Sequence, residues 1–304
     1  MKVIKILYLN IFLLLWFFSI AFGQGAPGTD IFLGEIKFDG TEIMISKINN
    51  ITDRDGYDNQ PYFTTYGKSL LFTSDREDAQ TDIYIYDILK KTTTVIHKTS
   101  PEAEYSANPV LGTNGKYYSS IRVEADGTQR LWKFPLGNGQ PEIIFKDIKP
   151  VGYHAWIDNN TVAMFVLADR ANNIPITLQI GDTRTGRSET VEENIGRSIH
   201  KVPGEKSVSF VHKEGNENWT VKEYDLGKRS FKNLVKTLPG KEDYFWIDDD
   251  TIIMGNGSKL FGFDISGNSK DWIEICDLSS YGVKDISRLA VSPGSDRIAV
   301  VSGR

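Results

Sequence analysis

The stretch TDIYIYDI, residues 81–88, decides the fold, because isoleucine and tyrosine alternate in it and leave both faces of a β-strand apolar. The surrounding residues 59–96 read NQPYFTTYGKSLLFTSDREDAQTDIYIYDILKKTTTVI. They predict four short strands, separated by a Gly-Lys turn, a polar loop and a basic turn. A strand that is apolar on both faces indicates a sheet packed between two neighbouring sheets.

The four-strand unit recurs along the chain. Residues 107–145, 153–191, 199–234 and 244–275 carry similar successions of apolar strands and polar turns. Aligning the first strand of each unit, and of a sixth unit at the C-terminus, gives positions at steps of 48, 45, 46, 45 and 44 residues: Pro61, Pro109, His154, His200, Phe245 and Leu289. A repeat of about 40 to 50 residues that holds four strands is typical of the blade of a β-propeller.

The sixth unit is divided between the two ends of the chain. Residues 287–304, SRLAVSPGSDRIAVVSGR, predict only the first two strands of a blade. The stretch TDIFLGEI, residues 29–36, resembles the third strand, and TEIMISKI, residues 41–48, can serve as the fourth. Joining them in one blade removes two exposed sheet edges. The sequence therefore predicts an all-β, six-bladed β-propeller with four-stranded blades, whose N-terminal strands complete the last blade.

Two of the repeats resemble those of TolB-like propellers. Residues 62–87, YFTTYGKSLLFTSDREDAQTDIYIYD, are similar to a whole repeat of that family, and residues 291–304, VSPGSDRIAVVSGR, are similar to its first half. The resemblance extends over nearly all of residues 29–304 and implies a six-bladed periplasmic or secreted propeller of the broad WD-repeat-like class. The protein that gives the family its name carries an extra domain ahead of its propeller, for which we expect no room here.

Composition and the N-terminus indicate an exported protein. The chain has 35 basic and 40 acidic residues and a net charge of −5, so no basic field attracts nucleic acid. Two lysines precede the apolar run at residues 6–22, and small residues follow it, so we predict a signal peptide over residues 1–23 and a single propeller domain over residues 24–304. The expected location is periplasmic or secreted, as a monomer. An uncleaved signal anchor that tethers the chain to the membrane is the alternative.

Motifs for catalysis are not found. The sequence has no Gly-x-Ser-x-Gly, P-loop, dinucleotide or His-Glu-x-x-His pattern, and its single cysteine, Cys276, stands in a predicted strand. Acidic clusters at residues 55–58 and 248–250 could attract calcium, but each lies at a predicted turn, where aspartate is favoured for backbone reasons. Asp75 with Arg76 is expected to form a structural hydrogen bond or ion pair at the turn rather than a charge pair that binds a partner.

Two histidines are candidate metal ligands. The alignment places His154 and His200 at one structural position of adjacent blades, near the mouth of the central channel, where the two imidazoles could converge on a divalent transition metal. Gln60 or Asn108 could supply a third ligand. The resemblance adds weight, because certain polysaccharide lyases of the wider TolB-like class hold a metal with histidines of successive blades. The alternative is that both are partly buried side chains bonded to loop carbonyls.

Two functions follow from these observations. The first is an exported, non-catalytic scaffold that needs no cofactor and binds an envelope protein, a peptide or peptidoglycan-associated machinery through its loops. The residues expected to contact such a partner are Tyr57, Tyr105, Arg170 and Tyr281. The second is a metal-dependent, polysaccharide lyase-like enzyme that acts on an acidic glycan with the two histidines at the channel mouth.

Overall fold

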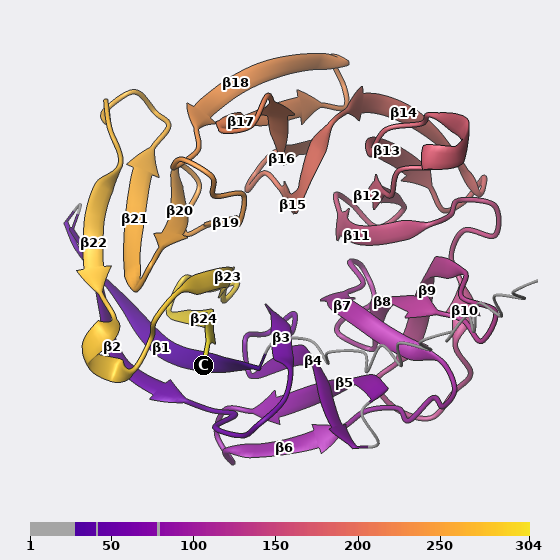
Figure 1. Ribbon diagram of the computed structural model, residues 1–304, viewed down its shortest axis with the longest axis horizontal. Helices are drawn as coiled ribbons and strands as arrows, with labels where there is room; N and C mark the ends of the chain where they lie inside the picture. Colours follow the sequence, from indigo (N-terminus) through magenta and orange to yellow (C-terminus); the bar gives the residue numbers. More distant parts are fainter. Residues whose placement is uncertain (1–27, 41, 78–79) are drawn as a thin grey trace, which may run out of the picture.

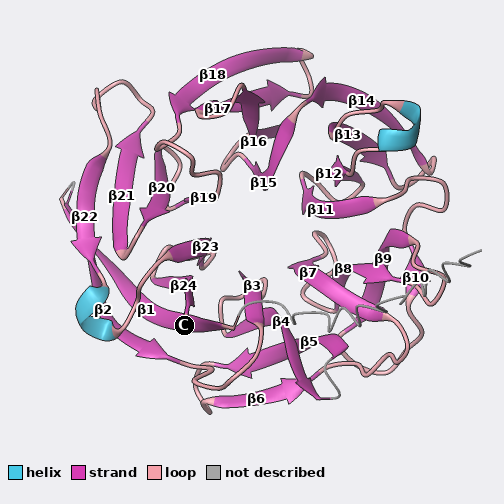
Figure 2. Cartoon of the chain, viewed as in Figure 1, coloured by secondary structure: helices cyan, strands magenta, loops and turns pink. Residues whose placement is uncertain are grey.

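Six four-stranded antiparallel sheets surround a central axis in the computed structural model, which describes residues 28–40, 42–77 and 80–304 (Figure 1). The first strand of each sheet lies nearest the axis and the last lies at the rim (Figure 1). Strands account for nearly all of the regular structure, and two short 3₁₀ turns lie at the periphery (Figure 2). The predicted all-β, six-bladed propeller is confirmed.

In the first five blades, four consecutive strands run from the axis outward. Blade 1 comprises β3 (Asp58–Phe63), β4 (Ser69–Glu77), β5 (Gln80–Asp87) and β6 (Thr92–Val95). Blade 2 comprises β7 (Ala103–Pro109), β8 (Tyr117–Val123), β9 (Gln129–Pro135) and β10 (Glu142–Ile143). Blade 3 comprises β11 (Val151–Trp156), β12 (Thr161–Val166), the 3₁₀ turn η1 (Arg170–Asn172), β13 (Thr177–Asp182) and β14 (Arg187–Glu193).

Blade 4 comprises β15 (Ile195–Lys201), β16 (Ser207–Glu214), β17 (Asn218–Asp225) and β18 (Ser230–Lys236). Blade 5 comprises β19 (Tyr244–Trp246), β20 (Thr251–Asn256), β21 (Lys259–Asp264) and β22 (Ile273–Asp277), and the 3₁₀ turn η2 (Ser279–Tyr281) follows it. Blade 6 comprises β23 (Ile286–Val291), β24 (Arg297–Gly303), β1 (Thr29–Asp39) and β2 (Glu42–Asn50).

Blade 6 closes the ring in the predicted way. The sheet order is β2-β1-β24-β23, so both ends of the chain contribute two strands each. Strand β1 pairs antiparallel with β24, beginning with Thr29 opposite Gly303. The guanidinium of Arg304 lies 2.8 Å from the Asp30 carboxylate and adds an ion pair to this junction. Strand β1 is therefore paired along both of its edges, while β2 forms the outer edge of the blade.

The hydrophobic core lies between the blades. In blade 1, Phe72 and Tyr84 pack toward blade 6, where they meet Ala299 of β24. Their neighbours in the chain, Leu71 and Ile83, pack against blade 2. This arrangement confirms that the alternating residues of β5 serve two different interfaces, because successive side chains of a strand point to opposite faces.

A buried serine joins neighbouring blades at two interfaces. The indole Nε1 of Trp156 in blade 3 donates to Ser119 Oγ of blade 2 over 2.8 Å. Likewise, Trp246 in blade 5 donates to Ser209 Oγ of blade 4 over 2.9 Å. Each serine thus satisfies an indole N–H that the packed blades remove from water.

The predicted signal peptide, residues 1–23, lies outside the described residues. Within the part of the chain that is described, no helix is long and apolar enough to cross a membrane.

Candidate functional site at the channel mouth

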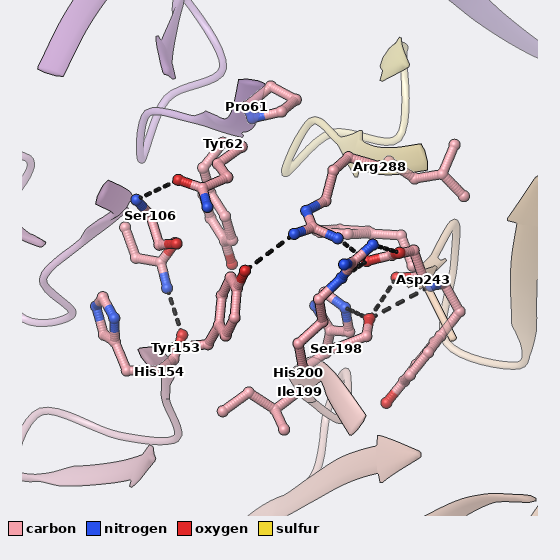
Figure 3. A pocket seen from close by; sticks show the side chains of 16 residues that line it. Pro61, Tyr62, Ser106, Tyr153, His154, Ser198, Ile199, His200, Asp243 and Arg288 are labelled. Carbon is pink, nitrogen blue, oxygen red and sulfur yellow. Dashed lines mark hydrogen bonds and ion pairs between the residues drawn. The ribbon is translucent and has the colours of Figure 1, made fainter. Parts of the chain in front are cut away.

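One position recurs around the axis in all six blades. In every blade, the backbone N–H that follows the innermost strand donates to the carbonyl of the first residue of the second strand, as Thr64 does to Ser69. Counting four residues back from that N–H gives equivalent positions in the six blades: Gln60, Ser106, Tyr153, Ser198, Asp243 and Arg288. We call these six residues the mouth ring. All of them line one pocket of about 80 Å³ at the channel (Figure 3).

Three residues of the mouth ring and Arg197, which also lines the pocket, form an ion-pair network that connects four blades. The Asp243 carboxylate of blade 5 lies 2.5 Å from Arg197 Nη2 of blade 4 and 2.6 Å from Arg288 Nη1 of blade 6. Arg288 Nη2 also donates to the hydroxyl of Tyr153 in blade 3 over 3.0 Å (Figure 3). These side chains are only partly exposed, so their charge-assisted bonds are screened less than those of surface pairs.

Neighbouring charges stabilise the charged form of Arg197 in this network. Burial works to lower the pKa of Arg197, but its attraction to Asp243 and Glu242 outweighs burial and raises that pKa. Glu242 is itself held by Lys213, whose Nζ lies 2.8 Å from it. Two carboxylates therefore stand among three cations, and the mouth keeps a net positive charge.

Two of the predicted partner-contact tyrosines lie beside the mouth ring. Burial raises the pKa of Tyr57 to about 12, while the nearby charge of Arg288 lowers it and Tyr153 and Tyr105 add smaller increases. Such influence requires Tyr57 to be close to Arg288 and to Tyr105, and Tyr105 directly precedes Ser106 of the mouth ring; both side chains are half-buried. The channel mouth thus combines charged, hydroxyl and aromatic groups.

The other two predicted contacts lie away from the channel. Arg170 begins η1 and Tyr281 ends η2, and both turns lie at the outer rim (Figure 2). The Tyr281 side chain is 46% exposed. The structure brings two of the four predicted residues together and leaves these two at separate places on the rim.

The predicted equivalence of His154 and His200 is wrong by one residue. The closing hydrogen bonds show that His154 shares its position with Pro61 and Leu289, whereas His200 and Phe245 lie one residue later in their blades and Pro109 lies two later. A shift of one residue in a strand turns the side chain to the opposite face. The closing N–H groups of blades 3 and 4, at Ile157 and Val202, are 45 residues apart, whereas His154 and His200 are 46 residues apart, so the two histidines are not equivalent.

The two histidines consequently point to different neighbours. His154 is 3% exposed, and its Nε2 lies 2.6 Å from Ser119 Oγ of blade 2. His200 packs its ring against Tyr244 and Phe245 of blade 5. In Figure 3, Tyr153 lies between the two imidazoles. Burial lowers the pKa of His154 to about 3 and that of His200 to about 4, so both rings are neutral at neutral pH.

The predicted third ligands, Gln60 and Asn108, line the same pocket, but both side chains already form hydrogen bonds within the protein. Gln60 Oε1 accepts from Thr73 Oγ1 and from the backbone N–H of Ser106, both over 2.9 Å. Asn108 Nδ2 donates to the backbone carbonyl of His154 over 2.6 Å. Among the described residues, no group of three or more His, Cys, Asp or Glu side chains is arranged to hold a metal ion. A metal bound by the two histidines stays a prediction.

The acidic clusters have structural partners. Asp58 is fully buried, and its carboxylate lies 3.1 Å from Arg54 and 3.4 Å from Arg76. Asp75 pairs with Arg54 over 3.0 Å, so Asp75 and Arg76 both make the expected structural contacts, through this cluster. In the other acidic cluster, Asp248 Oδ1 accepts two backbone N–H groups of its own turn. These carboxylates serve turns and ion pairs, as expected.

Sequence reasoning missed most of the mouth ring. Tyr153, Ser198, Asp243 and Arg288 recur at steps of 45 residues, yet they share no chemical type that would reveal the repeat. The only signal in the sequence is the spacing itself, and it becomes readable once the closing hydrogen bond of each blade defines the register.

No protein-family model matches the sequence, and no curated protein matches it. Solved structures do match. A TolB-type protein from Agrobacterium tumefaciens superposes with a TM-score of 0.68 at 13% identity, over 92% of this chain and 99% of that one. TolB from Acinetobacter baumannii gives a TM-score of 0.58 at 13% identity, over 91% of this chain and 65% of that one. An oligogalacturonate lyase in complex with manganese gives 0.57 at 10% identity, over 86% and 83%. The chain therefore has the TolB-like six-bladed propeller fold.

Proposed function

We propose that this protein is an exported, non-catalytic scaffold that binds a segment of an envelope protein or peptide at the channel mouth. The observation that carries the proposal is the network of Arg197, Asp243, Arg288 and Tyr153, which converges on one pocket from four blades. The ring holds these groups in place before a partner binds, so little conformational entropy is lost at the site on binding. The positively charged mouth and its tyrosines suit an acidic or carboxylate-bearing segment.

The contact between Ser198 and His200 at the mouth supports binding over catalysis. Ser198 Oγ lies 3.0 Å from His200 Nε2, which is the separation of a nucleophile and its base. The serine is, however, 8% exposed, and its hydroxyl is shared with the backbone N–H and carbonyl of Tyr244. Burial also lowers the pKa of His200 to about 4, which makes its imidazole a weak base. The pair therefore serves the contact between blades 4 and 5.

The proposed location is the periplasm or the extracellular space, since a signal peptide over residues 1–23 would export the propeller. Crosslinking of the protein in its own cell envelope, followed by co-purification and mass spectrometry, tests both location and partner. Arg288→Met removes the charge of the mouth but keeps the aliphatic stem, and Tyr57→Ser removes an aromatic contact. Tyr281→Ser is the matched change at the rim.

We expect the partner to be recovered with the wild type and with Tyr281→Ser, and to be lost with Arg288→Met and Tyr57→Ser. Circular dichroism of each variant shows whether the propeller is still folded. Recovery with both mouth variants, together with loss in Tyr281→Ser, would place the binding face at the rim and contradict the proposal.

The second candidate function is the metal-dependent, lyase-like enzyme. It is favoured by one observation, namely that His154, His200, Gln60 and Asn108 all line the same pocket. Calorimetric titration with manganese and zinc tests it directly. Binding heat that disappears in His154→Ala, with loss of activity on an acidic glycan in His200→Ala, would establish the enzyme. No heat with either metal would remove this candidate and leave the scaffold.

A further inference from the structure

A second hollow lies where blade 5 meets the closing blade 6. It is a groove of about 950 Å³ between the outer strands β2 and β22, extended by the turns that connect β19 to β20 and β23 to β24. These turns join first to second strands, so the groove opens on the face where the innermost strands end. The mouth ring instead lies within or just before those strands, four residues before each closing N–H, and it shares no lining residue with the groove. The groove is thus separate from the channel mouth.

The groove has an apolar floor that continues the core between the blades. Phe38 and Ile43 are opposite each other in the pairing of β1 with β2 and lie on the same face. Ile43 and Ile275 of β22 pack against the buried cluster between blades 5 and 6. Toward the rim this apolar surface is uncovered, since Phe38 is 44% exposed and Ile273 is 63% exposed.

The walls of the groove are acidic. Six carboxylates line it, and none of its lining residues is a lysine or an arginine: Glu42, Asp248, Asp249, Asp250, Asp264 and Glu274. Only Glu274 has an ion pair among those found in the described chain, with Lys259 over 2.8 Å. Hydrogen bonds from Ser266 and Asn268 lower the pKa of Asp264 and keep it ionised. The apolar floor is therefore surrounded by negative charge that the protein itself neutralises only in part.

We propose that this groove binds an extended, basic segment of a partner polypeptide, in which lysine or arginine alternates with aliphatic side chains. Alternation places the apolar side chains of such a segment on one face, toward Phe38 and Ile273, and its cations on the other, toward the carboxylates. Charge complementarity favours a basic segment as the occupant of the groove. An acidic segment would be repelled by six carboxylates, and a purely polar cation would leave the apolar floor exposed to water.

The probe is a fluorescently labelled decapeptide of alternating leucine and lysine, with two counterparts in which serine replaces leucine or glutamate replaces lysine. Its binding to the purified protein is followed by fluorescence anisotropy. Ile273→Ser removes an apolar contact, and Ile174→Ser is its control, because Ile174 is 50% exposed in blade 3, outside the groove. Asp249→Asn combined with Glu42→Gln removes two charges, and Glu193→Gln combined with Glu217→Gln, at exposed positions of blades 3 and 4, makes the same change of net charge outside the groove.

The leucine–lysine peptide is expected to bind at least about tenfold more tightly than either counterpart, which corresponds to about 1.4 kcal/mol. Ile273→Ser should weaken it about tenfold, and the double charge variant should weaken it severalfold and flatten its salt dependence. The two control variants and Arg288→Met should bind like the wild type. Equal affinity for the serine–lysine peptide, equal effects of groove and control variants, or no binding at all would overturn the proposal. Because Arg288→Met alters only the channel mouth, a result that overturns peptide binding in the groove leaves the proposed function of the channel mouth untouched.

Discussion

Acid should destabilise this propeller through a histidine that is neutral only because it is buried. Burial lowers the pKa of His154 to about 3, from an ordinary value of 6.5. The unfolded chain takes up a proton at this residue near pH 6.5, while the native protein does not until about pH 3. The unfolded state thus binds more protons over that whole window, so stability is lost as the pH falls through it.

The loss can be worked out from these two values. Between pH 7 and pH 5, proton uptake by the unfolded chain at His154 lowers the free energy of unfolding by about 2 kcal/mol. This is a large part of a typical net stability of about 5 to 15 kcal/mol. His200 shifts in the same direction, with its pKa lowered to about 4, but its ring is only half-buried and should contribute less.

The test is urea unfolding of the wild type and of His154→Gln at pH 7 and pH 5. Glutamine keeps a polar group near Ser119 and does not titrate, so the variant should lose about 2 kcal/mol less than the wild type over this range. All other titrating groups are common to both proteins and cancel in the comparison. If the free energy of unfolding falls equally in the two proteins, with unchanged m-values, the reasoning is refuted. His154 would then have the same pKa in the native and the unfolded protein.

Three further predictions concern the blades. Ser119→Ala leaves the buried indole N–H of Trp156 without its acceptor and should lower the free energy of unfolding by about 2 kcal/mol in urea; an unchanged midpoint would show that water replaces the hydroxyl. Gly255→Ala places a Cβ 2.6 Å from the Cβ of Ile286 in the next blade and should cost about 1 to 3 kcal/mol, seen as a lower Tm. Burial and nearby acidic groups raise the pKa of Cys276 to about 11, so a disulfide reagent at pH 8 should react about 100-fold more slowly than with a free thiol; a normal rate would contradict this.

Local patterns in the sequence were sufficient to predict the architecture of the protein. Alternating isoleucine and tyrosine in residues 81–88 predicted a strand packed on both faces, and the structure places Ile83 and Tyr84 in different inter-blade clusters. The steps between repeats predicted six blades, and the missing strands of the last repeat predicted closure by residues 29–36. These features depend on which residues are apolar and how often they recur, and both can be read along the chain.

The candidate site depended on register, which the sequence does not reveal. His154 and His200 occupy similar places in the repeat pattern, yet they differ by one residue in their distance from the closing hydrogen bond and so point to opposite faces. Asp243 and Arg288 showed no shared motif, and only the ring geometry brings them within 2.6 Å of each other. The buried apolar clusters lie between the blades, so the repeating apolar pattern does not specify which polar side chains stand at the mouth. The sequence by itself therefore determined the blades, and the closed ring alone decided which polar groups meet at its axis.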